Sequence, residues 1–386
     1  MLDRRAMSIP SDRLPEALEE RIHQKQAVLE QRQKAFGDRI YIHSYMENIG
    51  WPELFGYDMN RVFTDAAFAM EMELRQRIFW ADNSLDDAVP GLWMQATVGM
   101  YYDITLFGEI VTHTPEGVPL FGRHPIADTP DLSLIPPIDF HASGMQRQLL
   151  ALHQNMQQLN RHRYGGKLTI GFPGFGRGPL DVCIQMRTYE NFIEDTAERP
   201  EFVHALLDRI ASERVAYNVW RRKYLGEAPP KDPTCGIDDD WVYCPFISPG
   251  IFRQFVLPVY RRIARDEGPL VHFHTCGSIV PIVHDLLDAF PSLKTLDVGG
   301  WNDFEQLDQM VDPEVAFSLA FKNTFVLAGT PQQHRDVLRR IAHVSRRRKV
   351  TICAQAMVRL HDTYDEDLAR MNAFIALARQ TFAEEA

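Results

Sequence analysis

Short apolar runs alternate with longer amphipathic segments through the second half of the chain. The predicted strands are Leu168–Phe172, Thr234–Asp238, Leu270–His274, Thr295–Val298, Val315–Leu319 and Val350–Cys353. The segments with helical spacing between them include Tyr189–Tyr224, Pro249–Arg265, Ser278–Ala289 and Pro331–Arg346. Such alternation is typical of a parallel sheet with crossover helices. Polar residues gather at the carboxyl ends of the runs and no Gly-x-Gly-x-x-Gly follows a first strand, so the pattern favours a (β/α)8 TIM barrel over an open sheet.

The N-terminal part of the chain predicts a helical extension. Residues 11–36 repeat Leu14, Leu18, Ile22 and Leu29 at helical spacing among charged residues, which indicates a surface helix. Its apolar stripe needs a partner, either the barrel or a second subunit. We therefore divide the chain into a helical arm and extension over residues 1–80 and a barrel over residues 81–386.

Composition and charge restrict the class of protein. The chain is 45% hydrophobic and 24% charged, as in ordinary globular proteins. Its net charge of −11, from 52 acidic and 41 basic residues, argues against general nucleic-acid binding. The one basic run, at residues 346–349, follows a helical pattern, and we interpret it as a solvated helix end.

The location follows from similar observations. No stretch approaches 18 consecutive apolar residues, and the polar N-terminus lacks the apolar segment of a secretory signal, so we expect no membrane span. Five cysteines in such a chain predict reduced thiols in the cytoplasm.

Residues 272–277, His-Phe-His-Thr-Cys-Gly, carry the clearest chemical signal. Side chains alternate along a strand, so His272, His274 and Cys276 face one side. An imidazole and a thiolate two positions apart at a strand end can bind one zinc ion, although a packed core His and Cys is the alternative. We interpret His272 as a hydrogen-bonded residue of the barrel interior. Cys353, which ends the last predicted strand, is the best candidate for a third metal ligand, leaving one position open for catalysis.

Acidic residues follow the strand predicted at Thr234–Asp238. Asp239 and Asp240 are candidates for a general acid or base, for orienting a metal ligand or, beside Trp241, for binding a cationic substrate. The alternative is a solvated loop in which one Asp caps a helix. Asp297, in the strand predicted at Thr295–Val298, is a second candidate for proton transfer.

Two further segments supply candidate substrate-binding residues. Arg177 lies in the glycine-rich loop 174–178, which either clamps a carboxylate or phosphate or is a plain turn. The aromatic region Trp80–Phe107, with Trp93 and Tyr102, is either an apolar lid over the barrel mouth or the core of an N-terminal helical subdomain.

Several motifs resemble the uroporphyrinogen decarboxylase superfamily, which includes cobalamin-linked methyltransferases of the methylcobalamin:coenzyme M type. The matching segments are Gly178–Asp181, Arg199–Val203, Ile247–Pro258, His274-x-Cys276-Gly277 and Gly329–Pro331. Their order and spacing together carry the resemblance, which covers the chain from residue 179 onward and extends more weakly back to residue 82.

The resemblance implies a site and a cofactor. Metal-free decarboxylases of the superfamily carry an Arg-rich N-terminal segment of the form RQAGRY, which is absent here. The methyltransferase branch binds zinc through His-x-Cys and a later Cys, which match His274, Cys276 and Cys353. Cys353 lacks the Thr-Pro that usually follows the later Cys, so His361 or Asp362 is an alternative third ligand. The usual partner of this branch is a corrinoid, free or carried by a separate protein.

The sequence therefore predicts a zinc-dependent enzyme that moves a methyl group between a small methylated compound or thiol and a corrinoid. One alternative is a metal-free decarboxylase, with Asp239 or Asp240 as proton donor and Arg177 holding a carboxylate. The other is a non-catalytic, corrinoid-binding barrel. The resemblance and the N-terminal stripe together predict a homodimer.

Overall fold

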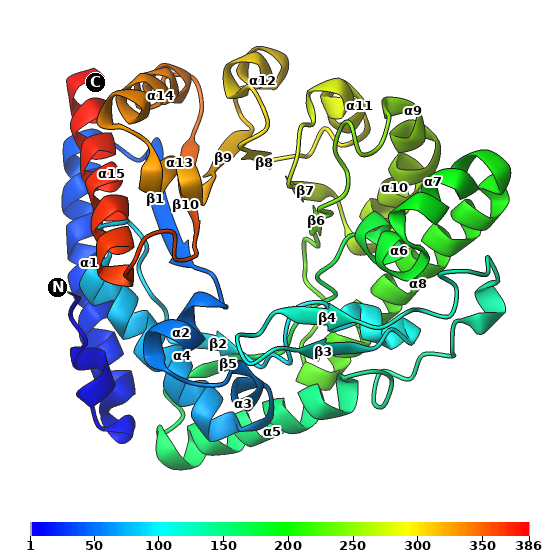
Figure 1. Ribbon diagram of the computed structural model, residues 1–386, viewed down its shortest axis with the longest axis horizontal. Helices are drawn as coiled ribbons and strands as arrows, with labels where there is room; N and C mark the ends of the chain where they lie inside the picture. The colour runs from blue at the N-terminus through cyan, green and yellow to red at the C-terminus, as the bar shows by residue number, and fades with distance from the viewer. Residues whose placement is uncertain (1, 386) are drawn as a thin grey trace.

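The computed structural model describes residues 2–385, apart from the side chains of residues 35, 36 and 355–357. Parallel strands form a ring that helices surround (Figure 1). A six-stranded sheet has the order β1-β10-β9-β8-β7-β6, and a two-stranded sheet pairs β2 with β5. The strands are β1 (Ile40–Met46), β2 (Trp93–Gln95), β5 (Thr169–Gly171), β6 (Cys235–Asp238), β7 (Leu270–His274), β8 (Thr295–Gly299), β9 (Ala316–Phe321) and β10 (Val350–Met357). These are the eight strands of a TIM barrel, and the predicted fold class is confirmed.

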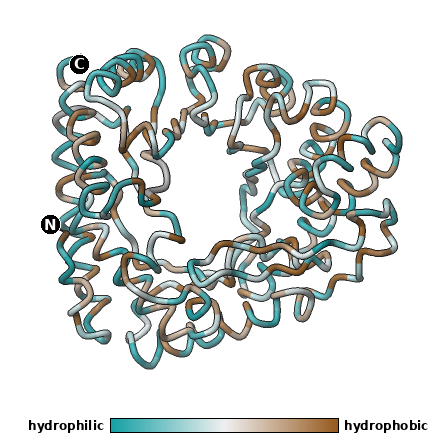
Figure 2. The backbone as a smooth tube through the Cα atoms, in the orientation of Figure 1, coloured by the Kyte–Doolittle hydropathy of each residue, from teal (hydrophilic) through white to brown (hydrophobic). Residues whose placement is uncertain are grey.

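Most of the helices lie outside the strands, where brown and teal alternate along them as expected for helices that pack on one face (Figure 2). The helices before β6 are α1 (Leu14–Phe36), α2 (Gly50–Phe55), α3 (Met59–Thr64), α4 (Ala66–Asn83), α5 (Gln146–Arg163), α6 (Pro179–Arg187), α7 (Tyr189–Glu198) and α8 (Pro200–Leu225). The later ones are α9 (Pro249–Ile251), α10 (Leu257–Glu267), α11 (Val283–Ala289), α12 (Phe304–Met310), α13 (Asn323–Ala328), α14 (Pro331–Ser345) and α15 (Tyr364–Glu385). Among the described residues, no helix is both long and apolar enough to cross a membrane.

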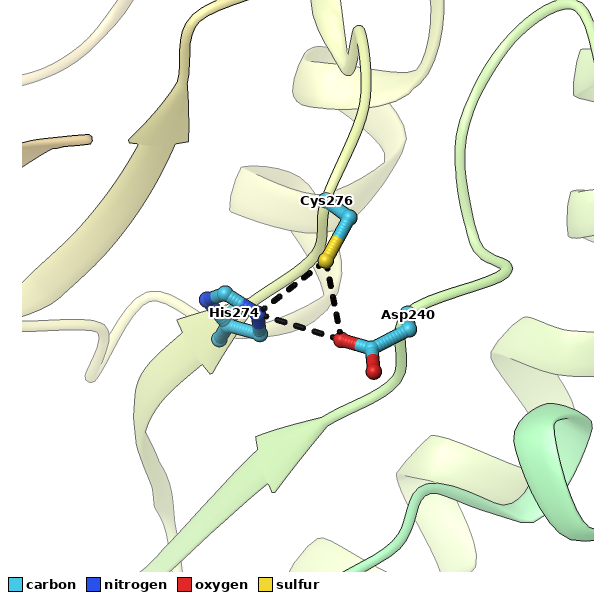
Figure 3. Close-up of side chains that lie close together, drawn as sticks. All are labelled: Asp240, His274 and Cys276. Carbon is cyan, nitrogen blue, oxygen red and sulfur yellow. Dashed lines mark hydrogen bonds and ion pairs between the residues drawn. The ribbon is translucent and has the colours of Figure 1, made fainter. Parts of the chain in front are cut away.

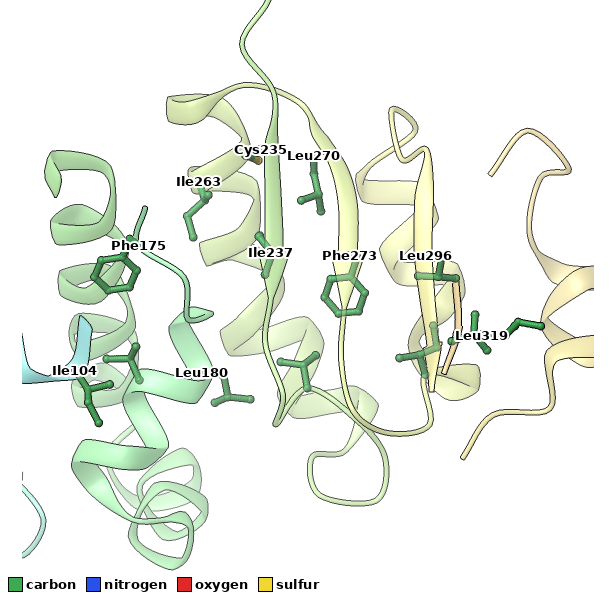
Figure 4. Close-up of a cluster of buried hydrophobic side chains, with 14 of the residues drawn as sticks. Ile104, Phe175, Leu180, Cys235, Ile237, Ile263, Leu270, Phe273, Leu296 and Leu319 are labelled. Atoms are coloured by element: carbon green, nitrogen blue, oxygen red, sulfur yellow. The ribbon is translucent and has the colours of Figure 1, made fainter. Parts of the chain in front are cut away.

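The core lies between the strands and the outer helices. The core side of successive strands carries fully buried side chains, which are Ile237, Phe273 and Leu296 (Figure 4). From the helical layer, Ile263 of α10 is buried in the same core. Alternate residues of the same strands face the barrel axis instead. On β7, for example, Phe273 is buried whereas His272 and His274 are only half-buried. All six predicted strands are present with bounds that differ by a few residues.

The barrel begins earlier in the chain than predicted. β1 pairs in parallel with β10, with His43 opposite Cys353, and forms one edge of the six-stranded sheet. Residues 1–80, predicted as a helical arm and extension, therefore also contribute a strand to the six-stranded sheet. Local sequence did not reveal this strand as part of the barrel, because its partner β10 lies near the other end of the chain.

The N-terminal helix covers its own barrel. Leu14 and Leu18 of α1 are fully buried, and Ile22 packs on the same core. Arg21 of α1 binds Asp82 of α4 with Nε 3.0 Å from Oδ1. Since this face is already covered within the chain, it no longer argues for a dimer.

The basic run at residues 346–349 is not a solvated helix end throughout. The Arg348 side chain is fully buried, and its Nε donates to Asp308 Oδ1 at 2.6 Å. Its other nitrogens donate to the carbonyl oxygens of Asp308, Val311, Asp312 and Val315. Arg348 thus links the α12–β9 connection to the start of β10 by hydrogen bonds. The sequence around Arg348 does not show that these carbonyl groups lie beside it.

Replacing this arginine should destabilise the fold. In Arg348→Met the buried carboxylate of Asp308 loses its best partner and the carbonyls lose their donor. We expect the free energy of unfolding to fall by about 3–5 kcal/mol, as for a broken buried ion pair. The control is Arg346→Met, whose exposed side chain should contribute about 0–1 kcal/mol. Equal shifts of the two urea-unfolding midpoints would contradict the assigned role.

Candidate metal centre at the barrel mouth

Three side chains converge at the carboxyl end of β7. His274 is the last residue of this strand, Cys276 follows it in the loop, and Asp240 follows the neighbouring strand β6 (Figure 3). Asp240 Oδ1 lies 3.2 Å from His274 Nε2 and 3.2 Å from Cys276 Sγ, and the Nε2–Sγ distance is 3.7 Å. Cys276 is exposed, so the group can be reached from solvent.

Asp297 of β8 fixes the orientation of His274. Its Oδ2 lies 2.8 Å from His274 Nδ1, which leaves Nε2 directed at Asp240 and Cys276. Burial alone would lower the pKa of His274, but the hydrogen bonds to Asp240 and Asp297 raise it to about 12. A histidine held on one nitrogen by a carboxylate is the usual arrangement of a metal-ligating imidazole.

The spacing of the three donor atoms fits a zinc ion. With bonds of about 2.0–2.1 Å to N and O and about 2.3 Å to S, a tetrahedral zinc separates its donors by roughly 3.3–3.6 Å. The measured distances of 3.2, 3.2 and 3.7 Å are close to these values. Among the described residues, this is the one group of three His, Cys, Asp or Glu donor atoms within 4.8 Å of one another. A mixed N, S and O donor set suits zinc.

Arg177 holds the outer oxygen of Asp240. Its guanidinium NH1 lies 2.5 Å from Asp240 Oδ2 and 3.0 Å from Asp181 Oδ2. Burial acts to raise the pKa of Asp240, but His274 and Arg177 hold it well below its usual range. Arg177 is thus bound to two carboxylates of the chain itself and positions Asp240.

Asp239, a predicted catalytic candidate, does not belong to the group of three donors. It is fully buried and accepts hydrogen bonds from the amides of Leu180 and Asp181 and from the Tyr260 hydroxyl. Burial, with the charge of Asp181, raises the pKa of its carboxyl to about 8. A side chain on Gly178 would collide with it, because a Cβ there would lie 2.3 Å from Asp239 Cβ. Asp239 therefore anchors the start of α6 to β6.

Cys353 lies close to the three-residue group but outside it. It faces the barrel axis from β10, and burial followed by the charge of Asp297 raises the pKa of its thiol to about 12. The alternative ligand His361 is bound to Asp367, with Nδ1 2.5 Å from Oδ1. Asp240, which we expected in proton transfer, is thus the third residue of this group, and Cys353 is not among the three.

The comparisons with known proteins agree with this fold. The uroporphyrinogen decarboxylase (URO-D) family matches residues 100–371. The chain belongs to this family. Its match leaves out β1 and β2, which the structure nevertheless places in the same barrel.

One solved structure of the same shape is a methyltransferase from Methanosarcina mazei. The TM-score is 0.59 over 89% of this chain and 94% of that chain, at 15% sequence identity, a level that shows the fold alone. Among curated proteins, none matches the chain.

The aromatic residues predicted to bind substrate lie in different places. Trp93 projects from β2 on the side opposite the buried Met94, toward the barrel axis, and its indole lies over Gly171. It is therefore half-exposed within the barrel wall, neither in a lid nor in a helical subdomain. Tyr102 donates a hydrogen bond to the Gly174 carbonyl, and Trp241 packs on Tyr189 and Phe246.

Two further residues support this site, and the sequence suggested only that Tyr101 belongs to the aromatic region Trp80–Phe107 and gave no role to Asn302. Tyr101 has a positive φ of 64°, rare for a bulky residue, and its ring lies 4.0 Å from the guanidinium carbon of Arg177. Asn302 ties the Cys276 loop to the β8 loop, because it donates to the Gly277 carbonyl and accepts from the Ile279 amide. Both depend on contacts between segments far apart in sequence.

The Asp297–His274 pair predicts a specific loss of metal affinity. In Asp297→Asn the amide cannot support the imidazole as a carboxylate does, so zinc affinity should fall about 10–100-fold. The matched control is Asp238→Asn, because Asp238 faces His272 at 3.3 Å in the same way but away from the donor group. Competition with a chromophoric chelator measures both, and equal weakening would contradict the assigned orientation.

Proposed function

We propose that this protein is a zinc-dependent methyltransferase that moves a methyl group between a small methylated compound or thiol and a corrinoid. The observation that carries the proposal is the orientation of His274 by Asp297 toward the same point as Cys276 and Asp240. The name of the structurally similar methyltransferase is consistent with it. The corrinoid, free or on a separate protein, would approach the exposed Cys276 at the barrel mouth.

The chain's own residues divide the work. His274 and Cys276 would hold zinc, with Asp240 as third donor on the geometry and Cys353 as the ligand implied by the family pattern. Bound there, zinc would keep a thiol deprotonated and nucleophilic, or polarise a methyl ether or thioether. Arg177 keeps Asp240 anionic and in place, and Asp297 holds His274 so that its Nε2 faces the other two donors.

The contacts of the acidic residues disfavour the decarboxylase alternative. That reaction needs a free arginine for the substrate carboxylate and a reachable carboxylic acid as proton donor. Asp239 is fully buried, and Asp240 and Arg177 bind each other. The contacts of Asp239, Asp240 and Arg177 are instead explained if these residues form or support a metal site.

The metal content tests the ligand assignment. We expect about one zinc per chain in protein purified without added metal. Cys276→Ala should lose the zinc and keep its melting temperature, because residues at the barrel mouth serve function more than stability. His272→Ala should keep the zinc, since His272 pairs with Asp238 outside the donor group.

Two further variants identify the third ligand. On the present geometry Asp240→Ala should weaken zinc binding more than Cys353→Ala. The reverse order would assign the position to Cys353, whereas zinc retained by Cys276→Ala would contradict the whole site.

The activity itself is read from the corrinoid. Methylcobalamin mixed with the zinc-loaded protein and a panel of thiols should lose its methyl group, with a change of visible absorbance. Cys276→Ala should show no such reaction at any thiol concentration. Full turnover by metal-free protein would overturn the proposal.

A further inference from the structure

The barrel wall is open between its first two strands. Over residues 2–385, no backbone pairing joins β1 to β2. The free edge of β1 is instead satisfied by Asp86 and Asp87, whose carboxylates accept from the amides of Ser44 and Ile42. Trp80 of α4 donates its indole N–H to the Ser44 carbonyl at 3.0 Å. These contacts fix a stable seam in the wall without filling it.

Two adjoining cavities lie along this seam. One, of about 410 Å³, is bounded by His43 and Tyr45 of β1 and by Trp51, Trp80 and residues 88–91. The second, of about 330 Å³, continues toward α3 and the hairpin formed by β3 (Val111–His113) and β4 (Pro119–Phe121). Both are lined by Asn48, Glu73 and Gln76, so they meet at these residues. Their size is that of ordinary small-molecule pockets.

The first cavity is bounded by β1, whose axis-facing side borders Cys353 of β10. His43 stands directly opposite Cys353 in the β1–β10 register. The rings of His43 and Tyr45 stack with centroids 5.8 Å apart on the axis-facing side of β1. Tyr45 lies two residues beyond His43 on β1, and burial raises the pKa of its phenol.

The charges around the cavities exclude an anion. Among the described lining residues, Arg77 is the one arginine or lysine. Its guanidinium is bound to Glu73 at 2.7 Å and to the Gly91 carbonyl at 2.6 Å. Glu47 adds a further carboxyl, and burial lowers the pKa of His43 and so keeps it neutral. A carboxylate, phosphate or sulfonate would therefore enter without a cationic partner.

The remaining lining is aromatic and rich in methionine. Trp51 and Trp80 meet edge to face at 6.0 Å, beside the stacked pair on β1. Met59, Met72 and Met100 line the second cavity, where flexible thioethers adapt to a flat ligand. The side-chain amides of Asn48 and Gln76 supply hydrogen-bonding groups where the two cavities join.

We propose that the seam between β1 and β2 binds the body of an uncharged aromatic molecule whose methyl group reaches the metal centre beside Tyr45. The binding site itself stands on the cavity, and its role as the methyl donor's pocket rests on the function proposed above. The specificity for the methyl donor then comes from the wall of the barrel. The corrinoid approaches the metal centre from the open mouth.

The test compares two probes of nearly the same shape. 4-Methoxybenzamide is uncharged, and 4-methoxybenzoate carries the excluded charge. Titration calorimetry on the zinc-loaded protein should show the amide binding at least about tenfold more tightly, a difference of about 1.4 kcal/mol. The same preference should persist in Cys276→Ala, because the cavity does not need the metal.

Filling variants locate the site. Ala88 lines the first cavity and is half-exposed, so Ala88→Phe should fill it and weaken binding of the amide about tenfold or more. Gln76→Phe should fill the space where the two cavities join and should weaken binding of the amide in the same way. It replaces Ala88→Phe in the test if that variant does not fold. The matched control is Ala151→Phe on the exposed face of α5, which should bind as wild type.

The outcomes separate this inference from the proposed function. Equal binding of the two probes, or binding unaffected by either filling variant, would overturn the seam as the ligand site even in an active methyltransferase. Preferential binding of the amide that both filling variants abolish would support the seam as the ligand site. This conclusion would hold even if the protein showed no methyl transfer.

Discussion

Each barrel strand here has to satisfy two environments, because its side chains alternate between the helical shell and the axis. Phe273 and Leu296 are buried against the helices, and the residues beside them, His274 and Asp297, are thereby directed to the axis. Since neighbouring parallel strands end at the same level, the two polar side chains meet at 2.8 Å. The metal centre is a consequence of this alternation, and the core that enforces it also fixes the histidine.

A second constraint is that each candidate metal ligand is held in place by another residue. Asp297 orients His274, Arg177 restrains Asp240, and Asn302 secures the loop that carries Cys276. Arg177 in turn is held by Asp181 at the start of α6, which Asp239 anchors to β6. The family motif at Gly178–Asp181 can thus be explained physically: Gly178 leaves room for Asp239, and Asp181 binds the arginine. The centre therefore rests on β6, β7, β8 and α6 together.

The sequence predicted what depends on local pattern. The six later strands, the barrel and the pairing of His274 with Cys276 all follow from periodicity and from residues two positions apart. The wrong or incomplete assignments depend on contacts between distant segments. Asp239 and Asp240 are adjacent in sequence, yet one is buried under α6 and the other faces the donors, because a strand turns alternate residues apart. Likewise, nothing local to Arg348 shows the carbonyls that bury it, and β1 pairs with β10 from the other end of the chain.

The same reasoning connects the seam to the chemistry. Polar axis-facing residues on β1 mark a strand that borders a ligand space instead of a packed interior, in contrast to the branched residues that usually fill such barrels. His43 and Tyr45 belong both to that space and to the surroundings of Cys353. On our proposal the open wall and the candidate metal centre are parts of one site.

The central claim is that zinc binds here through the side chains of His274 and Cys276. X-ray absorption at the zinc edge on purified protein tests it most directly, because it reports the atoms bound to the metal. The account predicts sulfur at about 2.3 Å with nitrogen or oxygen neighbours at about 2.0–2.1 Å, and loss of the sulfur signal in Cys276→Ala. A shell of nitrogen and oxygen alone, or protein that binds no zinc, would contradict it.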